Sequence, residues 1–326
     1  MKLPAYTLHR RRALGFTLAL IPGLSTLAGC AANADGSVRT APQVKELGRA
    51  DPGSFFENLV FGPDGALYIT DYTRRQVLRY TDKQGLRVHA TLEVHPLGIA
   101  FDVDGTMLLS CQEKNLFGGG GTMRNANLLY KARPGESLRR WKSIEAAGFL
   151  NGIVCMDSRR MLIADSRGGV IWMVHMDSDE VHRFVTHPLL DAADQASLTP
   201  AANGLKLHKG YLYVSNTARG IFLRLRVNGR QLGEIEVFAE NVRADDFAFS
   251  PDGRLFFTTH RDKIFFLEGD NPKEYAGAEA GISGNTALVW GPDGRGPYVI
   301  TDGGYVAQQW YGGPAAGPAR LLQFSA

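Results

Sequence analysis

The stretch Asn58-Leu59-Val60-Phe61-Gly62-Pro63-Asp64-Gly65-Ala66-Leu67-Tyr68-Ile69-Thr70 decides the fold, because it joins two short apolar runs through an Asp-Gly turn. An Asp-Gly pair between apolar runs is a strong signal for a β-hairpin. We therefore predict strands at 58–61 and 66–70, with further strands at 76–80 and 86–92. The same turn returns at Asp104-Gly105, Asp252-Gly253 and Asp293-Gly294.

This unit occurs six times along the chain, and each copy opens with one residue before its first apolar run. The opening residues are Glu57, Leu97, Asn151, Asn203, Asp245 and Thr286, which lie 40 to 54 residues apart. A period of this size with several short strands per unit is typical of a β-propeller. We predict an all-β, six-bladed β-propeller over residues 43–326.

The two ends of the propeller should complete one blade together. The last repeat stops at the C-terminus with its third apolar run, 321–324, and so lacks a fourth strand. The segment 44–49, which precedes the first repeat, is predicted to supply it. Pairing the two ends would close the ring and remove exposed sheet edges.

Residues 1–29 have the pattern of an export signal. Three arginines, Arg10 to Arg12, precede an apolar run at 13–28 that is too short for a membrane span. The sequence Leu27-Ala28-Gly29-Cys30 resembles a bacterial lipobox, which implies cleavage before Cys30 and a lipid on its thiol. The arginines also resemble a twin-arginine export signal.

These resemblances predict an exported bacterial lipoprotein on the periplasmic side, anchored to a membrane, with residues 30–42 as a tether. Ala31 follows the cysteine, where an Asp would signal retention in the inner membrane. The outer membrane is therefore favoured in a Gram-negative cell.

The charge of the chain bears on its binding partners, and its cysteines bear on disulfide formation. Without residues 1–29 the chain has 32 Lys and Arg against 33 Asp and Glu, and no basic patch is interleaved with aromatic residues. Nucleic-acid binding is thereby disfavoured. In an exported protein Cys111 and Cys155 could form a disulfide, or remain two buried free thiols, and their positions in the strands favour free thiols.

The opening residues of a propeller surround its central axis, so their chemistry predicts the site. Four of them, Glu57, Asn151, Asn203 and Asp245, offer oxygen atoms, which suit Ca²⁺ and also Mg²⁺ or Mn²⁺. No histidine or cysteine opens a blade, which argues against a dedicated zinc site, although Zn²⁺ remains an alternative. Any one of these residues could instead face a water-filled channel or serve a plain turn.

Four motifs carry a resemblance to a known family: Glu57-Asn58, Asn151-Gly152, Asn203-Gly204 and Ala244-Asp245-Asp246-Phe247. Together they resemble the senescence marker protein/gluconolactonase family, which includes regucalcin, over residues 43–326. The resemblance implies that Glu57, Asn203 and Asp245 bind one divalent cation and that Asn151 completes the site or contacts the substrate.

The implied activity is hydrolysis of a lactone or related ester, in which the cation polarises the carbonyl and Asp245 acts as general base. The sugar-lactonase members have an arginine two positions before the blade 3 asparagine. This chain has Phe149 there, and Leu97 opens blade 2. We therefore predict an apolar mouth in which Leu97, Phe149 and Asn151 contact a substrate less polar than a sugar lactone.

The ends of the second strands form another ring near the mouth, made of Asp71, Cys111, Asp165, Asn216, His260 and Asp302. These residues either orient the ligands or cap turns. We assign His260 to substrate binding. Two long loops, 112–127 with its glycine run at 118–121 and 187–201, lie on the same face. The glycine-containing loop is either a lid or a floppy connection.

Two other functions fit the same fold. One is a strictosidine synthase-like enzyme, which keeps the propeller and changes the reaction. The other is a binding or scaffold propeller with a structural cation and no catalysis. The oligomeric state is not predicted from the sequence.

Overall fold

The computed structural model describes residues 42–117, 126–194, 199–229 and 231–325. The predicted signal, Cys30, most of the tether and the glycine run at 118–121 lie outside these residues. Within the described ranges, no helix is both long enough and apolar enough to cross a membrane.

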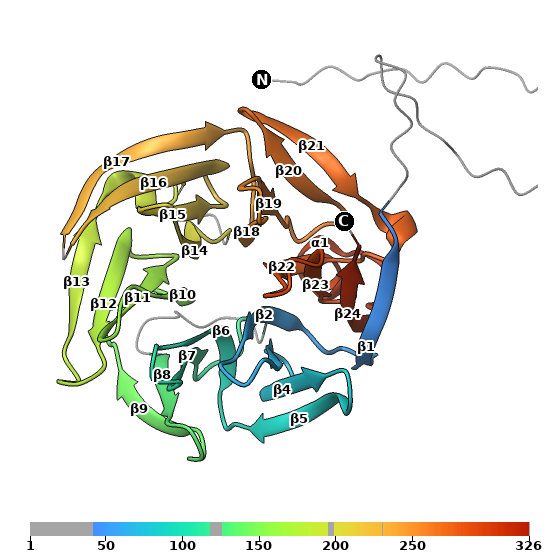
Figure 1. Ribbon diagram of the computed structural model, residues 1–326, viewed down its shortest axis with the longest axis horizontal. Coiled ribbons are helices and arrows are strands. Elements are labelled where there is room, and N and C mark those ends of the chain that lie inside the picture. Colours follow the sequence, from blue (N-terminus) through green and yellow to red (C-terminus); the bar gives the residue numbers. More distant parts are fainter. Residues whose placement is uncertain (1–41, 118–125, 195–198, 230, 326) are drawn as a thin grey trace, which may run out of the picture. The chain divides into compact units, whose positions relative to one another are not determined.

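Six antiparallel sheets of four strands each are arranged around a centre, and the first strand of each sheet lies nearest to it (Figure 1). This arrangement confirms the predicted six-bladed propeller. Blade 1 contains β2 (Phe56–Phe61), β3 (Leu67–Asp71), β4 (Gln76–Thr81) and β5 (Gly85–Thr91). Blade 2 contains β6 (His95–Phe101), β7 (Met107–Gln112), β8 (Asn127–Ala132) and β9 (Arg139–Ser143). Blade 3 contains β10 (Leu150–Cys155), β11 (Arg160–Asp165), β12 (Val170–His175) and β13 (Val181–Thr186).

The remaining blades follow the same order. Blade 4 contains β14 (Ala202–His208), β15 (Tyr211–Asn216), β16 (Ile221–Asn228) and β17 (Gln231–Glu240). Blade 5 contains β18 (Phe247–Phe249), β19 (Leu255–Phe257), β20 (Ile264–Glu268) and β21 (Asn271–Ala276). Blade 6 contains β22 (Asn285–Trp290), β23 (Pro297–Thr301) and β24 (Pro318–Phe324), and its fourth strand is β1 (Val44–Pro52). The antiparallel pairing of β1 with β24 confirms the predicted closure of the ring.

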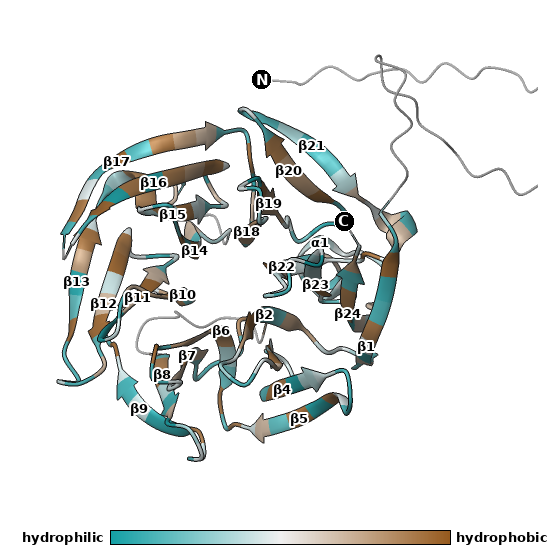
Figure 2. Ribbon diagram, viewed as in Figure 1, coloured by the Kyte–Doolittle hydropathy of each residue, from teal (hydrophilic) through white to brown (hydrophobic). Residues whose placement is uncertain are grey.

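The apolar core lies between neighbouring blades. Among the described residues, six core clusters each combine residues from two adjacent sheets, as where Leu162 of β11 joins Leu212 of β15. The third strands β16 and β20 are largely hydrophobic, whereas the outermost strands β9 and β21 are largely hydrophilic (Figure 2). This gradient follows the loss of apolar partners at the rim of each blade.

Hydroxyl groups at the ends of the second strands tie each blade to the next. Five of them donate to a carbonyl of the following inner strand at 2.6 to 2.8 Å. The pairs are Thr70 with Leu97, Ser110 with Asn151, Ser166 with Ala202, Ser215 with Asp245, and Thr258 with Thr286. Thr286 then donates to the carbonyl of Phe56 at 2.7 Å, which connects blade 6 to blade 1. These bonds fix the opening residues relative to one another.

Shifts in the pairing register of the first two strands change the direction of the opening side chains. The pairing of the first two strands shifts at Glu57, Leu97, Asn151, Asn203 and Thr286. Such bulges bend a strand and redirect a side chain, and they are common beside functional sites. The Asn-Gly pairs at 151–152 and 203–204 therefore lie inside strands, which removes the alternative that they serve plain turns.

A close approach between inner strands explains the glycines of these pairs. A Cβ atom on Gly152 would overlap the carbonyl oxygen of Asn203, and one on Gly204 would overlap the side chain of Asp246. Only glycine lets neighbouring inner strands come this close around the centre.

In the described part of the chain, three helical segments lie outside the sheets: η1 (Pro188–Leu190), η2 (Ala278–Ala280) and α1 (Tyr305–Tyr311). The sequence pattern did not predict α1, which occupies the connection from β23 to β24. Cys111 and Cys155 are free thiols, as favoured above, although Cys155 is only half-buried.

Candidate functional site

Three titratable side chains meet at the predicted centre. The ligand atoms of Glu57, Asp245 and His260 all lie within 4.8 Å of one another. Glu57 comes from the bulge in β2, Asp245 lies just before β18, and His260 follows β19. Two of these were predicted as metal ligands, and His260 was predicted only as a substrate contact.

Asp245 is the hub of the group. Its Oδ2 lies 2.7 Å from His260 Nε2, and its Oδ1 accepts a hydrogen bond of 2.6 Å from Asn203 Nδ2. Asn203 also donates to the Thr217 hydroxyl at 3.2 Å. The structure thus places Asn203 beside Asp245, as its predicted role as a ligand requires.

Asn151 occupies a different position. Its Nδ2 donates to the Ser166 hydroxyl at 3.4 Å, and its side chain is buried. No hydrogen bond between described residues joins it to Asp245 or Glu57. Its role as a fourth ligand or a substrate contact remains a prediction.

His260 is held in a strained backbone conformation. Its φ of 54° lies in the left-handed region, which is uncommon for a residue other than glycine and is often found at functional sites. The buried Asn285 fixes this loop: it accepts from Thr259 N at 2.7 Å and donates to the carbonyls of Arg261 at 2.7 Å and Lys263 at 2.8 Å. The His260 N–H donates to the Asn285 carbonyl at 2.8 Å. Asn285 therefore aims the imidazole at Asp245.

Burial and neighbouring charges determine the electrostatics of the group. Burial, followed by repulsion from Asp245, raises the pKa of Glu57 from 4.5 to about 8. Burial alone would lower the pKa of His260, but the carboxylates of Asp245, Asp302 and Glu57 raise it well above its usual 6.5. The neutral form of Glu57 and the charged form of His260 are therefore favoured near pH 7.

The donor set fits a divalent cation. Glu57 Oε2 is buried and has no hydrogen-bond partner among the described residues, so it is available to a cation. Glu57, Asp245 and Asn203 supply the oxygen ligands that suit Ca²⁺ or Mg²⁺. The nearby imidazole removes the basis of our argument against zinc, since Zn²⁺ and Mn²⁺ accept mixed nitrogen and oxygen ligands.

Most of the second ring caps turns. Asp71 accepts from the N–H groups of Phe55 and Arg74, and Asp165 accepts from those of Gly148 and Phe149. Asp302 accepts from three N–H groups at the start of α1, and Asn216 bridges to the carbonyls of Leu189 and Asp191. Cys111 is fully buried. Only His260 of this ring lies in hydrogen-bond reach of a predicted ligand.

Leu97 and Phe149 lie together, in one cluster with Phe55, Tyr72 and Val306. Leu97 is 2% exposed and Phe149 is 5% exposed, so both side chains are buried. Phe117, Tyr305 and Trp310 pack against this cluster. Leu97 and Phe149 thus lie in apolar surroundings, while the apolar mouth and its substrate contacts stay predictions.

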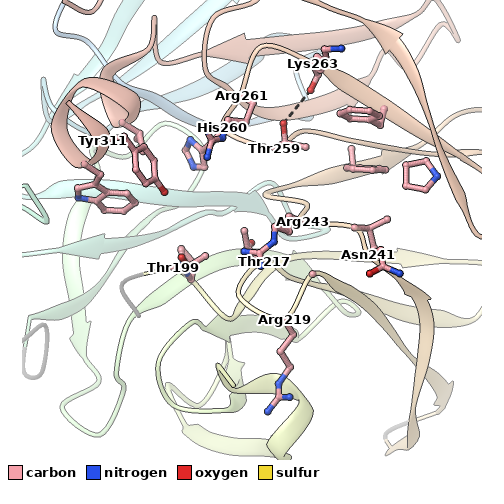
Figure 3. Close-up of a pocket in the computed structure, with 18 residues that line it drawn as sticks. Thr199, Thr217, Arg219, Asn241, Arg243, Thr259, His260, Arg261, Lys263 and Tyr311 are labelled. Atoms are coloured by element: carbon pink, nitrogen blue, oxygen red, sulfur yellow. Dashed lines mark hydrogen bonds between the residues drawn. The ribbon is translucent and has the colours of Figure 1, made fainter. Parts of the chain in front are cut away.

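A cavity of about 630 Å³ opens beside this group, among the loops of blades 4, 5 and 6 (Figure 3). It reaches the group at His260, and its lining includes Thr217, which accepts a hydrogen bond from Asn203. Trp310 and Tyr311 of α1 form part of its wall. Glu57 and Asp245 do not line it. A ligand in this cavity would therefore meet the imidazole before either carboxylate.

Sequence reasoning missed Asn285, Thr217 and the aromatic side chains of α1. Asn285 opens β22 next to the predicted opening residue Thr286, so its place in the repeat was a usable signal. No repeat signal marks α1, because it lies in an insertion.

No family model matches this chain, and no curated protein matches it. Among solved structures, the chain is similar to a gluconolactonase from Xanthomonas campestris, with a TM-score of 0.61 and 12% identity over 87% of this chain and 89% of that one. It is similar to a luciferin-regenerating enzyme, with a TM-score of 0.63 and 10% identity over 88% and 96% of the two chains. It is also similar to a catalytically inactive virginiamycin B lyase from Staphylococcus aureus solved with quinupristin, with a TM-score of 0.55 and 15% identity over 82% and 80%. The likeness at these identities is one of fold, shared with propellers that are mostly enzymes.

Proposed function

We propose that this protein is a divalent-metal-dependent hydrolase of a lactone or related ester. The observation that carries the proposal is the group of Glu57, Asp245 and His260, with Asn203 bonded to Asp245, at the centre of a rigid ring. A cation held by Glu57, Asp245 and Asn203 would polarise a substrate carbonyl and acidify a nearby water. The likeness to a gluconolactonase supports this choice of reaction class.

The chain's own residues supply binding and proton handling. Asp245 accepts a proton from the attacking water, and His260 donates a proton to the leaving alkoxide. Transfer of the proton from Asp245 to His260, 2.7 Å away, then restores both groups. The cluster around Phe55 and Phe149 keeps bulk water from the carboxylates, which strengthens electrostatic interactions there. Asn285 keeps the imidazole in place.

A panel of lactones and esters, assayed with and without a chelator, tests the proposal. We expect turnover of at least one lactone or ester, loss of turnover on chelation, and recovery with added Ca²⁺, Mn²⁺ or Zn²⁺. Turnover that is unaffected by complete metal removal would contradict it.

A metal-free lyase is the second candidate. The contact between His260 and Asp245 makes a polarised acid–base pair without any cation, and the fold is also that of virginiamycin B lyase. This candidate predicts cleavage without uptake of water, which incorporation of ¹⁸O from labelled water into the product distinguishes from hydrolysis.

We further propose that the protein works as an exported lipoprotein anchored through Cys30. The support is the lipobox-like sequence Leu27-Ala28-Gly29-Cys30 and the apolar run before it. This location would present the propeller to substrates outside the cytoplasm.

A further inference from the structure

The cavity beside His260 has an unbalanced charge. The described residues that line it include the cationic side chains Arg219, Arg243, Arg261 and Lys263. The described lining contains no aspartate or glutamate. The whole chain, by contrast, has nearly equal numbers of basic and acidic residues, 36 and 33. The positive wall is therefore a local feature.

Two of the four cations are already engaged. Lys263 is paired with Glu274 at 2.6 Å. Arg219 donates to the carbonyls of Asp191 and Pro188, and its side chain extends away from the other labelled residues (Figure 3). These contacts leave Arg243 and Arg261 as the cations available to a ligand.

Arg243 and Arg261 have no carboxylate partner within the described part of the chain. Arg243 makes no side-chain hydrogen bond or ion pair with a described residue, and Figure 3 draws it in the middle of the labelled side chains. The guanidinium of Arg261, the residue after His260, lies 5.1 Å from the ring centre of Tyr311. A guanidinium presents a planar fork of donors that matches a carboxylate or a phosphate.

The rest of the wall is apolar. Val242, Phe257, Phe265, Trp310 and Tyr311 contribute side chains to the same cavity. A ligand that matches this wall has an apolar or aromatic body and one anionic group. The volume of about 630 Å³ is in the range of pockets that bind small molecules.

We propose that this cavity binds the anionic group of an amphipathic substrate through Arg243 and Arg261, while the substrate's ester or lactone carbonyl lies at His260. The inference rests on the proposed function for the reaction at the carbonyl, but not for the binding of the anion. It names the substrate class as an apolar ester or lactone that carries a carboxylate or a phosphate.

Binding to chelator-treated protein tests the anion site without any reaction or metal. Calorimetric titration with 4-phenylbutyrate should show one site per chain, and its neutral amide should bind at least about 10-fold more weakly. Arg243→Gln should weaken binding of the acid by about the same factor. Arg139→Gln, a change at an exposed arginine on β9 of blade 2, should leave it unchanged. Phenyl phosphate binding tighter than 4-phenylbutyrate would assign the group to phosphate, and the reverse to carboxylate.

Equal affinity for the acid and the amide, or unchanged affinity in Arg243→Gln, would overturn the inference. Turnover separates this result from the fate of the proposed function. With 4-nitrophenyl glutarate, an anionic ester, Arg243→Gln should raise KM about 10-fold or more with little change in kcat. The ratio of kcat/KM for this anionic ester to that for neutral 4-nitrophenyl pentanoate should therefore fall about 10-fold. Anion binding without hydrolysis of any ester would retain the site and reject the hydrolase.

Discussion

His260 Nε2 lies 2.7 Å from Asp245 Oδ2, and the two residues flank one β-hairpin at its open end. Asp245 precedes β18 and His260 follows β19, so the tight turn between these strands brings them together. The Ser215 hydroxyl holds the carbonyl of Asp245, and Asn285 holds the loop of His260. The pair is therefore fixed from both neighbouring blades.

The pH dependence of stability should report on Glu57. In chelator-treated protein the folded state keeps the Glu57 proton up to about pH 8, whereas the unfolded chain loses it near 4.5. The folded state binds more protons in this window, so the free energy of unfolding falls as pH rises from about 5 to 8, by up to about 1.4 kcal/mol per pH unit. The raised pKa of His260 acts in the same direction above pH 6.5.

Glu57→Gln should remove the contribution of Glu57 to this slope between about pH 5 and 8, and should stabilise the metal-free protein at pH 7. Urea denaturation at a series of pH values measures both effects. A variant with the same slope as the wild type would show that Glu57 is not the protonated group.

Asn285→Ala should disrupt the loop that carries His260. The change removes hydrogen bonds to Thr259, Arg261 and Lys263 and leaves buried polar groups unpaired, at a cost of about 1–3 kcal/mol of stability. Because His260 would relax from its strained conformation, kcat should also fall. Asn216→Ala is the matched control, since Asn216 is equally buried and bridges a loop in blade 4. It should lose similar stability and keep its kcat, and equal loss of kcat in both variants would count against a positioning role for Asn285.

Much of this fold could be predicted from the sequence because the turn residues and the spacing of the repeats indicate the same strands. The predicted strands at 58–61, 66–70, 76–80 and 86–92 match β2 to β5 within a few residues, since the Asp-Gly turn fixes the register. The segment 44–49 was recognisable because the last repeat lacked a strand. Glu57, Asn203 and Asp245 were recognisable because each opens a blade.

The rest depends on contacts between segments that no local pattern connects. His260 enters the site through a left-handed backbone conformation that Asn285, 25 positions further along, maintains. The basic cavity wall combines loops from blades 4 and 5, and α1 of blade 6 completes it. The sequence also could not show whether Asp71, Asp165 and Asp302 cap turns or orient metal ligands. The N–H groups that donate to them show that they cap turns.

Substrate preference should follow the apolar surfaces of the mouth and cavity. Trp310 and Tyr311 line the cavity, and Tyr311 is 62% exposed. Each Å² of apolar surface that the substrate buries there contributes roughly 25 cal/mol. Aromatic or alkyl lactones should therefore have higher kcat/KM than gluconolactone in a mixed panel. The highest kcat/KM for gluconolactone would contradict this preference.

Cys30→Ser should change the location of the protein in a Gram-negative host. Without its thiol the chain cannot receive a lipid, so it should move from the membrane fraction to a soluble or unprocessed form. Fractionation followed by mass analysis of the N-terminus measures this change. Unchanged membrane association of a correctly processed variant would reject the anchor.

Metal titration of turnover in Glu57→Gln and Asp245→Asn tests the central claim most directly. Glu57→Gln weakens the cation site but keeps Asp245, so its activity should return in part as the metal concentration rises. Asp245→Asn keeps an oxygen ligand but loses the proton acceptor, so turnover should stay about 10²–10⁴-fold below wild type even at saturating metal. Wild-type turnover and metal dependence in both variants would contradict the account of Glu57 and Asp245 as the centre of a metal-dependent hydrolase.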